Sequence, residues 1–288
     1  MAETEALALY LTADGRSSQE ATREVWEYTD TRKDPAVTYS ATFTDFDWKL
    51  NGWMNDDEGV SILRTLGDAR VYIPYKPFLT NFDTTGKTFE IEFSTHNVVD
   101  YSAPIISCMH DGIGFEITPQ TITFNSSQVE LMTPFKDNEH IRVTIVVHKQ
   151  ASNRLILFYI NGVMSSAVQY PSGDNFGQGV NAAGITIGSN DCGVDIYNMR
   201  IYDIDLNSKQ VVNNWIADTS DGNLMMERYN RNNIYDNDVI NPNTLPNNLP
   251  YFIINAVELP QYKGDKKTVT LTFTDPMSPA KSFSASGV

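Results

Sequence analysis

Residues 141–170, which read IRVTIVVHKQASNRLILFYINGVMSSAVQY, decide the fold class. The first run, at 141–147, alternates between apolar residues on one side and Arg142, Thr144 and Val146 on the other, which is the period of a β-strand. Asn161-Gly162 joins two later runs, RLILFYI and VMSSAVQY. This dipeptide is the strongest short-range hairpin signal, because a type I′ turn needs positive φ at both central residues. The stretch therefore predicts a long strand followed by a hairpin.

Similar strand candidates extend on both sides of this stretch, from Ala36 onward. They recur with turn signals between them, as ARVYIPY, TFEIEFSTHNVV, APIISCM, GFEITP, TITFN, QVELMT, AGITIG and GVDIYNMRIYD. The first amphipathic helical pattern comes only at LNSKQVVNNWIAD, where Asn207 or Ser208 can cap a short helix. We therefore expect an all-β fold over residues 36–218, a two-sheet antiparallel sandwich closed by a short C-terminal helix.

The flanking segments differ in composition. Residues 1–35 are polar and charged and predict an N-terminal arm or linker, although Leu7, Leu9 and Leu11 alternate as a strand would. Residues 219–249 are rich in Asn and Pro and predict a second linker. Residues 250–288 resume β character and predict the start of a second, truncated β-rich module. We expect the chain to be a piece of a longer protein.

Composition excludes several classes of function. The 36 acidic residues outnumber the 21 basic residues, and the net charge is −15. Nucleic-acid binding needs clustered Lys and Arg, so no nucleic-acid partner is expected. The N-terminus lacks the basic leader and apolar core of a signal peptide, and no run approaches the roughly 20 apolar residues of a membrane helix. No membrane insertion is expected.

Catalytic patterns are weak. Glu90 and Glu92 share a face in FEIEF, but Ser94 and Thr95 follow where a glycan hydrolase of the E-x-D-x-E kind needs another acid. The four histidines, His96, His110, His140 and His148, have neither metal-ligand spacing nor a nucleophile at a fixed distance. We expect no enzyme activity, with a hydrolase that uses Glu90 or Glu92 as the least favoured alternative.

The two cysteines, Cys108 and Cys192, exclude a disulfide framework of the small secreted kind. Both lie in apolar strand-like sequence. Buried free thiols are the favoured interpretation, and a single bridge between strands stays open.

The order TFEIEF, RVTIVVHKQASNRLILFYINGVMSS, ITIGS, VDIYNMRIYDIDLNSKQVVNNWIAD resembles laminin G-like domains of the concanavalin A-like lectin and glucanase superfamily. The resemblance covers residues 36–218 and implies a jelly-roll sandwich. ADGRSSQEATREVWEY, FDWKLNGW and LPYFII…KKTVTLTFTDP are similar to multidomain phage and bacterial surface proteins in which a module similar to spore-coat protein H kinases follows.

The resemblance also raises calcium as a cofactor, because many laminin G-like domains hold an ion at the rim of the sandwich. Asp191 and Asp195 are the candidate ligands, with Asn190, Asp203 and Asp205 near them in the sequence. An equally favoured interpretation is that Asp195 stabilises a loop by hydrogen bonds and binds no ion.

Ligand binding is expected at the rim loops. STHNVVDYSAP joins two strand candidates and offers His96, Asn97, Asp100 and Tyr101, and the turn in CMHDGIG offers His110 and Asp111. We expect a binding or display module for a glycan or protein ligand, in contact with neighbouring modules of a virion or of the extracellular cell surface. The alternative is a purely architectural role in a virion.

Overall fold

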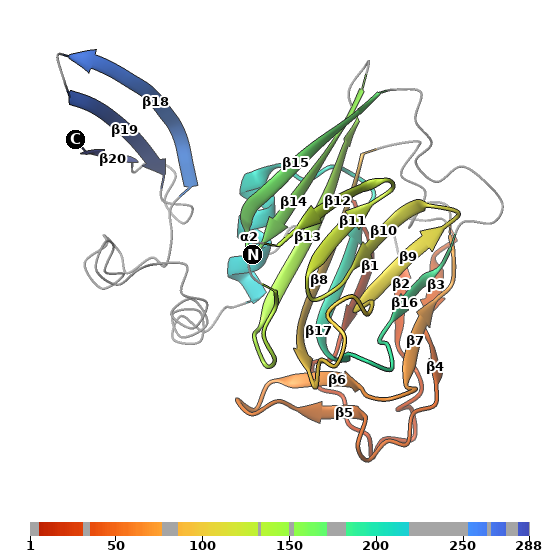
Figure 1. The fold of residues 1–288 in the computed structure, drawn as a ribbon. Helices are drawn as coiled ribbons and strands as arrows, with labels where there is room; N and C mark the ends of the chain where they lie inside the picture. The colour runs from red at the N-terminus through yellow and green to blue at the C-terminus, as the bar shows by residue number, and fades with distance from the viewer. Residues whose placement is uncertain are drawn as a thin grey trace. The chain divides into compact units, whose positions relative to one another are not determined.

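The computed structural model describes most of the chain, in nine segments (Figure 1). They are residues 6–30, 35–76, 86–131, 134–149, 153–171, 183–218, 253–263, 266–274 and 282–287. The chain divides into two compact units, one of residues 3–211 and one of residues 212–288 with Met1 and Ala2. The predicted linker at 219–249 lies outside the described residues.

The larger unit is a sandwich of two antiparallel sheets (Figure 1). The 8-stranded sheet has the order β15-β14-β13-β8-β17-β6-β5, with β1 also paired to β17. Its strands are β15 (Val163–Pro171), β14 (Asn153–Ile160), β13 (Ile141–Lys149), β8 (Lys87–His96), β17 (Gly193–Tyr202), β6 (Ser61–Thr65), β5 (Gly52–Asn55) and β1 (Leu7–Thr12). This arrangement confirms the predicted antiparallel sandwich.

The second sheet has 7 strands in the order β12-β11-β10-β9-β16-β7-β4. They are β12 (Ser127–Glu130), β11 (Thr121–Phe124), β10 (Ile113–Ile117), β9 (Ile106–His110), β16 (Ile185–Ile187), β7 (Arg70–Ile73) and β4 (Thr42–Thr44). A separate two-stranded sheet pairs β2 (Glu27–Asp30) with β3 (Val37–Ser40).

The core lies between the two large sheets. Phe89 of β8 packs against Phe115 of β10, with ring centroids 4.5 Å apart. The apolar side of β13 is buried there, as its alternation predicted. The opposite side of β13 is buried too, and it carries Arg142 and Thr144. Both faces of the central strands are therefore closed to water, one by apolar side chains and the other largely by polar ones.

The hairpin of β14 and β15 has the predicted turn. Asn161 and Gly162 have φ of 51° and 78°, both positive as a type I′ turn requires. The Asn161 side chain also accepts a hydrogen bond of 2.8 Å from the Arg142 backbone N–H. The turn is therefore fixed to β13 as well as closing the hairpin.

The helix α2 (Ser208–Asp218) begins with a capping box. The N–H of Gln210 donates to Asn207 Oδ1 over 3.0 Å, and the N–H of Asn207 donates to Gln210 Oε1 over 2.9 Å. Asn207 is therefore the cap, and the Ser208 hydroxyl instead bonds the Tyr159 hydroxyl.

Residues 6–30 are part of the sandwich, which corrects the predicted arm or linker. β1 pairs with the second half of β17, with Tyr10 opposite Arg200. Leu9 and Leu11 are buried, and the Trp26 indole N–H donates to the Thr12 carbonyl. The alternation of leucines was thus a strand signal, whereas the polar composition of the segment reflected its turns.

The smaller unit contains a three-stranded antiparallel sheet, as the β character of residues 250–288 predicted. Its strands are β18 (Ile253–Lys263), β19 (Lys266–Thr274) and β20 (Ser282–Gly287). Over the described residues of the chain, no helix is long and apolar enough to cross a membrane.

Both cysteines are free and buried, so the bridge that the sequence left open is absent. Burial raises the pKa of each thiol to about 12. Because the thiolate is the reactive form, we expect no reaction of either thiol with a maleimide in the native protein and reaction of both after unfolding in urea. Mass spectrometry of the labelled protein checks this. Rapid labelling of the native protein would contradict it.

Candidate functional site

The loop that follows β8, residues 97–103, is tied at several points to its neighbours. We call it the Asn97 loop. Asn97 has φ of 52°, which turns the chain out of the strand. The N–H groups of Val99 and Asp100 donate to the Asp191 carbonyl over 2.8 and 3.3 Å, and the N–H of Val98 donates to Asp137 Oδ1 over 3.4 Å. Two segments distant in sequence therefore fix this loop.

Asp100 organises the Asn97 loop from within. Its Oδ1 accepts hydrogen bonds of 2.8 Å from both the N–H and the hydroxyl of Ser102. These bonds, the backbone one foremost, lower the pKa of Asp100. The predicted ligand group is thus engaged inside the loop.

The Asn97 loop presents two large side chains to solvent. Val99 is 79% exposed and Tyr101 is 44% exposed. An apolar side chain and an aromatic ring on a fixed backbone suit contact with the face of a sugar ring or with an apolar side chain of a protein.

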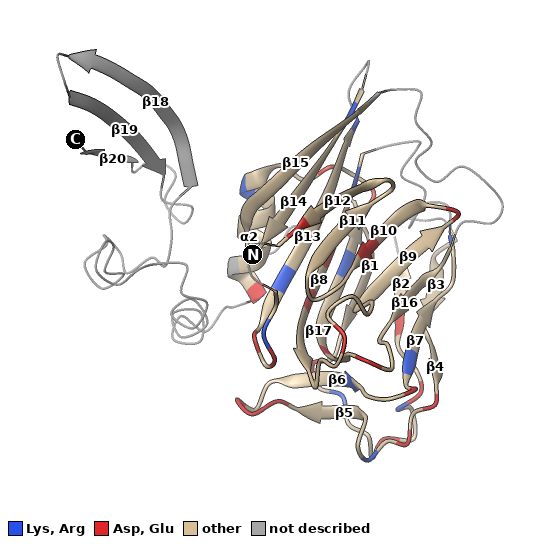
Figure 2. Ribbon diagram, in the orientation of Figure 1, with Lys and Arg blue, Asp and Glu red and all other residues tan. Residues whose placement is uncertain are grey.

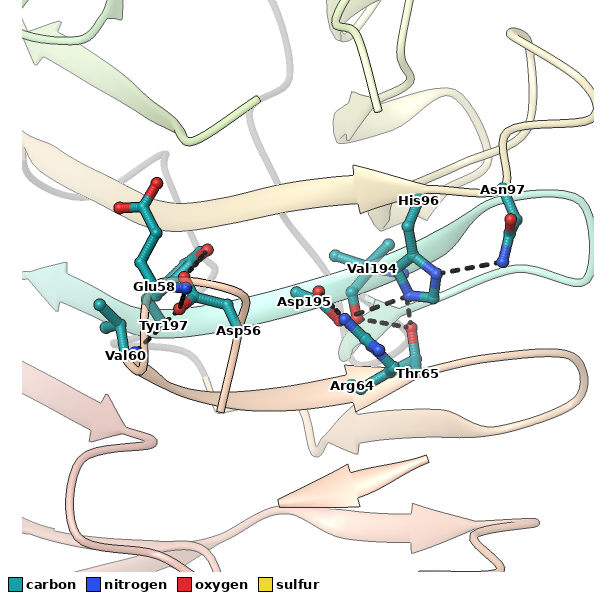
Figure 3. Close-up of polar contacts among 10 residues, drawn as sticks. All are labelled: Asp56, Glu58, Val60, Arg64, Thr65, His96, Asn97, Val194, Asp195 and Tyr197. Atoms are coloured by element: carbon teal, nitrogen blue, oxygen red, sulfur yellow. Dashed lines mark hydrogen bonds and ion pairs between the residues drawn. The ribbon is translucent and has the colours of Figure 1, made fainter. Parts of the chain in front are cut away.

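An ion-pair cluster lies beside this loop on the outer face of the 8-stranded sheet (Figure 3). Arg64 on β6 holds both oxygens of Asp195 on β17, with Nε–Oδ1 of 2.7 Å and Nη2–Oδ2 of 2.6 Å. His96 at the end of β8 places Nε2 at 3.3 Å from Asp195 Oδ1. The cluster therefore joins three adjacent strands.

The charges in this cluster stabilise one another. Burial acts to raise the pKa of Asp195, but the hydrogen bonds from Arg64 and His96 outweigh it, and the pKa is lowered. The bond to Asp195 raises the pKa of Arg64. Gly193 leaves room for His96, because a Cβ there would lie 2.5 Å from the imidazole ring. Asp195 is therefore a structural anion at neutral pH.

Tyr197 connects the same face to the β5–β6 turn (Figure 3). Its hydroxyl donates to Asp56 Oδ2 over 2.8 Å, while Asp56 Oδ1 accepts from the N–H groups of Glu58 and Val60. The Tyr197 ring stacks on His140 with centroids 3.9 Å apart. Burial is the main cause that raises the pKa of Tyr197, so it stays a neutral donor.

Glu90 and Glu92 lie on the outer face of β8, opposite the core residues, and both are buried. Glu92 Oε2 accepts from Arg142 Nη2 and Asn198 Nδ2, each over 2.6 Å, and Oε1 bonds His140 Nε2. Glu90 Oε2 lies 3.8 Å from Arg200 Nη1. Carboxylates so engaged are typical of structural networks that hold strands together.

The aspartates considered for calcium separate to the two ends of β17. Asp191 and Asp195 lie at its start, and Asp203 and Asp205 follow its end. The last two pair with other strands, Asp203 with Lys87 and Asp205 with His148. The Asn190 side chain accepts from Arg70. Among the described residues, no group of three or more His, Cys, Asp or Glu could hold a metal ion. The calcium ligands raised by the resemblance are thus not assembled.

The remaining predicted ligand residues, His110 and Asp111, lie apart from the Asn97 loop. They form the turn between β9 and β10, with Asp111 at φ of 51°. The Asn97 loop leads through Pro104 and Ile105 to Ile106, the first residue of β9, and His110 is the last residue of that strand. At a rise of about 3.3 Å per residue, the two ends are about 13 Å apart. Asn97, Asp100 and Tyr101 lie in one loop directly after His96, whose side chain is buried beside Asp195, whereas His110 and Asp111 lie in another turn.

Sequence reasoning missed Arg64, the partner of Asp195. The two residues are 131 positions apart, and β6, which carries Arg64, is a short run, SILRT. The run is short and does not alternate strictly, and nothing local indicates the strand with which it pairs.

No protein family and no curated protein matches the chain. Among solved structures, the chain is similar to the binding domain of botulinum neurotoxin serotype D, with 12% identity and a TM-score of 0.51 over 74% of this chain and 51% of that one. It is also similar to the binding domain of botulinum neurotoxin DC, solved in complex with SialylT and with rat synaptotagmin II. These two matches have 13% identity and a TM-score of 0.50 over 74% of this chain and 52% of those.

These similarities establish the fold alone, since the identities are low. The chain spans about half the length of the neurotoxin binding domains. What the two have in common is the antiparallel β-sandwich.

Proposed function

We propose that residues 6–218 form a non-catalytic, laminin G-like binding module that takes a glycan or protein ligand at the Asn97 loop. The module belongs to a multidomain phage virion or bacterial surface protein, next to further modules. The observation that carries the proposal is the exposure of Tyr101 and Val99 on a loop fixed by hydrogen bonds. The neurotoxin binding domains, solved with SialylT and with synaptotagmin II, are consistent with a binding role for this fold.

The rigidity of the Asn97 loop supports this role. A loop that is already ordered loses little conformational entropy when a ligand binds, so more of the contact energy remains as affinity. Asp191, Asp137 and Asp100 provide that order before any ligand arrives. Tyr101, an aromatic residue of the kind enriched at binding hot spots, is the expected centre of the contact.

The buried carboxylates support a role without catalysis. A glycan hydrolase needs two carboxyl groups that reach the scissile bond. Glu90 and Glu92, the only pair that the sequence suggested, face a network of Arg142, Arg200 and Asn198.

We expect the full chain to bind ligands on a glycan array or in pull-downs from cell-wall material. Tyr101→Ala is expected to weaken that binding at least about thirtyfold, since aromatic hot spots contribute about 2 kcal/mol or more. The matched control is Tyr72→Ala, because Tyr72 is a tyrosine of similar exposure, 41%, on β7. Titration of each variant with the bound glycan gives the two dissociation constants.

The same assay is run with calcium and again with a chelator. Binding that the chelator abolishes would make calcium part of the site. Equal affinity of the Tyr101 and Tyr72 variants would remove the Asn97 loop from the proposal. The absence of any ligand would favour the alternative, an architectural role in a virion.

A further inference from the structure

The sandwich has four terminal strands, and one of them differs from the rest. Three are short: β5 and β12 have 4 residues each and β4 has 3. Each also carries or adjoins acidic residues: β12 ends at the exposed Glu130, β4 is followed by the exposed Asp45, and β5 is followed by an acidic turn that begins with Asp56. Short length and charge are two means by which proteins keep an open strand edge from pairing with another chain. These three edges are therefore protected.

β1 is also paired along one side only within the sheet, but other groups occupy its carbonyls. The Trp26 indole donates to the Thr12 carbonyl over 2.9 Å, and the Tyr28 hydroxyl donates to the Leu7 carbonyl over 3.4 Å. This edge is therefore closed by side chains of the same chain.

β15 has neither kind of protection along most of its length. It has 9 residues, VMSSAVQYP, with no Asp, Glu, Lys or Arg, and proline occurs only at its last position. Figure 2 shows the strand without charged residues. Val163 and Met164 are exposed large hydrophobic residues. Within the described segments, the main chain of β15 pairs with β14 alone.

We propose that two copies of this chain associate through the outer edge of β15, which continues the 8-stranded sheet across a two-fold axis. An antiparallel pair of identical strands is self-complementary, because a two-fold axis places the backbone N–H and C=O groups of each copy opposite the C=O and N–H groups of the other copy. The net charge of −15 makes two copies repel each other overall. The uncharged strand is the surface on which they meet without opposed acids.

This contact goes beyond the proposed ligand binding and leaves the ligand site open. β13 and β14 separate β8, which carries the Asn97 loop, from β15. A dimer of this kind presents two Asn97 loops at once. Two linked sites raise the avidity for a repetitive ligand without any new contact.

Sedimentation velocity on the full chain over a dilution series tests the proposal. We expect a reversible dimer that becomes stronger as salt is added, because salt screens the repulsion between two acidic copies. Ala167→Lys, at an exposed position in the middle of β15, is expected to weaken the dimer at least about a hundredfold, since like charges opposed across an interface cost several kcal/mol. The matched control is Gln128→Lys on the exposed side of β12, which is expected to leave the dimer unchanged.

Urea denaturation of both variants confirms that each is folded, and Met164→Lys replaces Ala167→Lys if the latter unfolds. Hydrogen exchange provides a second readout: backbone amides of β15 are expected to be protected more strongly in the dimer than after dilution. A monomer at every concentration and salt would overturn the proposal. So would a dimer that Ala167→Lys and Gln128→Lys affect equally.

Discussion

Arg142→Ala is expected to lower the free energy of unfolding by about 3–5 kcal/mol, the range for breaking a buried ion pair. Arg142 is 1% exposed, and its Nη2 donates to Glu92 Oε2 over 2.6 Å and to Asn198 Oδ1 over 3.3 Å. Alanine removes the cation but leaves the Glu92 carboxylate buried. His140 and Asn198 still bond that carboxylate, but they do not replace a permanent positive charge.

Urea denaturation of the full chain measures this loss, with unfolding of the sandwich followed by tryptophan fluorescence. Arg64→Ala is the comparison, because Arg64 also pairs with a buried acid but has a side chain 28% exposed, so water compensates part of the loss. Arg142→Met combined with Glu92→Gln removes both charges and is expected to recover much of the stability. A loss of about 1 kcal/mol or less for Arg142→Ala would place this pair with ordinary surface ion pairs.

The second large effect is expected for Gly114→Ala in β10. Gly114 has φ of 120°, a conformation that L side chains rarely adopt. A Cβ there would overlap the backbone carbonyl of Cys108 on the neighbouring strand β9, whose carbon would lie at 2.9 Å. Backbone strain and overpacking each cost about 1–3 kcal/mol, so the total expected loss is about 2–6 kcal/mol.

Gly112→Ala in the adjoining turn is a control that has a positive φ without the steric contact. Gly112 has φ of 77°, but nothing lies within 4 Å of a Cβ at that position. Its substitution therefore reports backbone strain alone, expected at about 1–2 kcal/mol. Thermal and urea unfolding of both variants give the difference. If the two alanines cost the same, the contact with Cys108 is relieved by a shift of the strands.

Most of the fold could be predicted because its signals are local. The alternation in residues 141–147, the Asn161-Gly162 turn and the cap at Asn207 each depend on neighbours in sequence, and each has its place in the structure. The role of residues 7–12 could not be predicted in the same way. Their strand pairs with residues 198–202, and local sequence does not specify a partner so distant.

The same distinction between local signals and distant contacts applies to the residues of the candidate site. Asn97, Asp100 and Tyr101 are close in sequence, and a single loop keeps them together. His110 and Asp111 have similar residue types, but they lie at the far end of β9 from this loop. Asp100 lies in the expected loop, but its carboxylate accepts a hydrogen bond from Ser102 within the loop rather than facing a ligand. The residue type indicates which interactions a side chain can make, and the fold decides which partner it makes them with.

The pairing of β1 with β17 also sets the order in which the chain can fold during synthesis. β1 is translated before the other strands of the sandwich, but the strand that it pairs with is the last of the sandwich, and the N–H of Asp203 just beyond it donates to the Ala6 carbonyl over 2.9 Å. The strand β1 therefore has no partner strand until almost the whole sandwich has been translated, and its leucines are not yet buried. Contacts between segments so far apart in sequence form slowly. During that interval an exposed apolar strand is a substrate for chaperones and a point where nascent chains can associate.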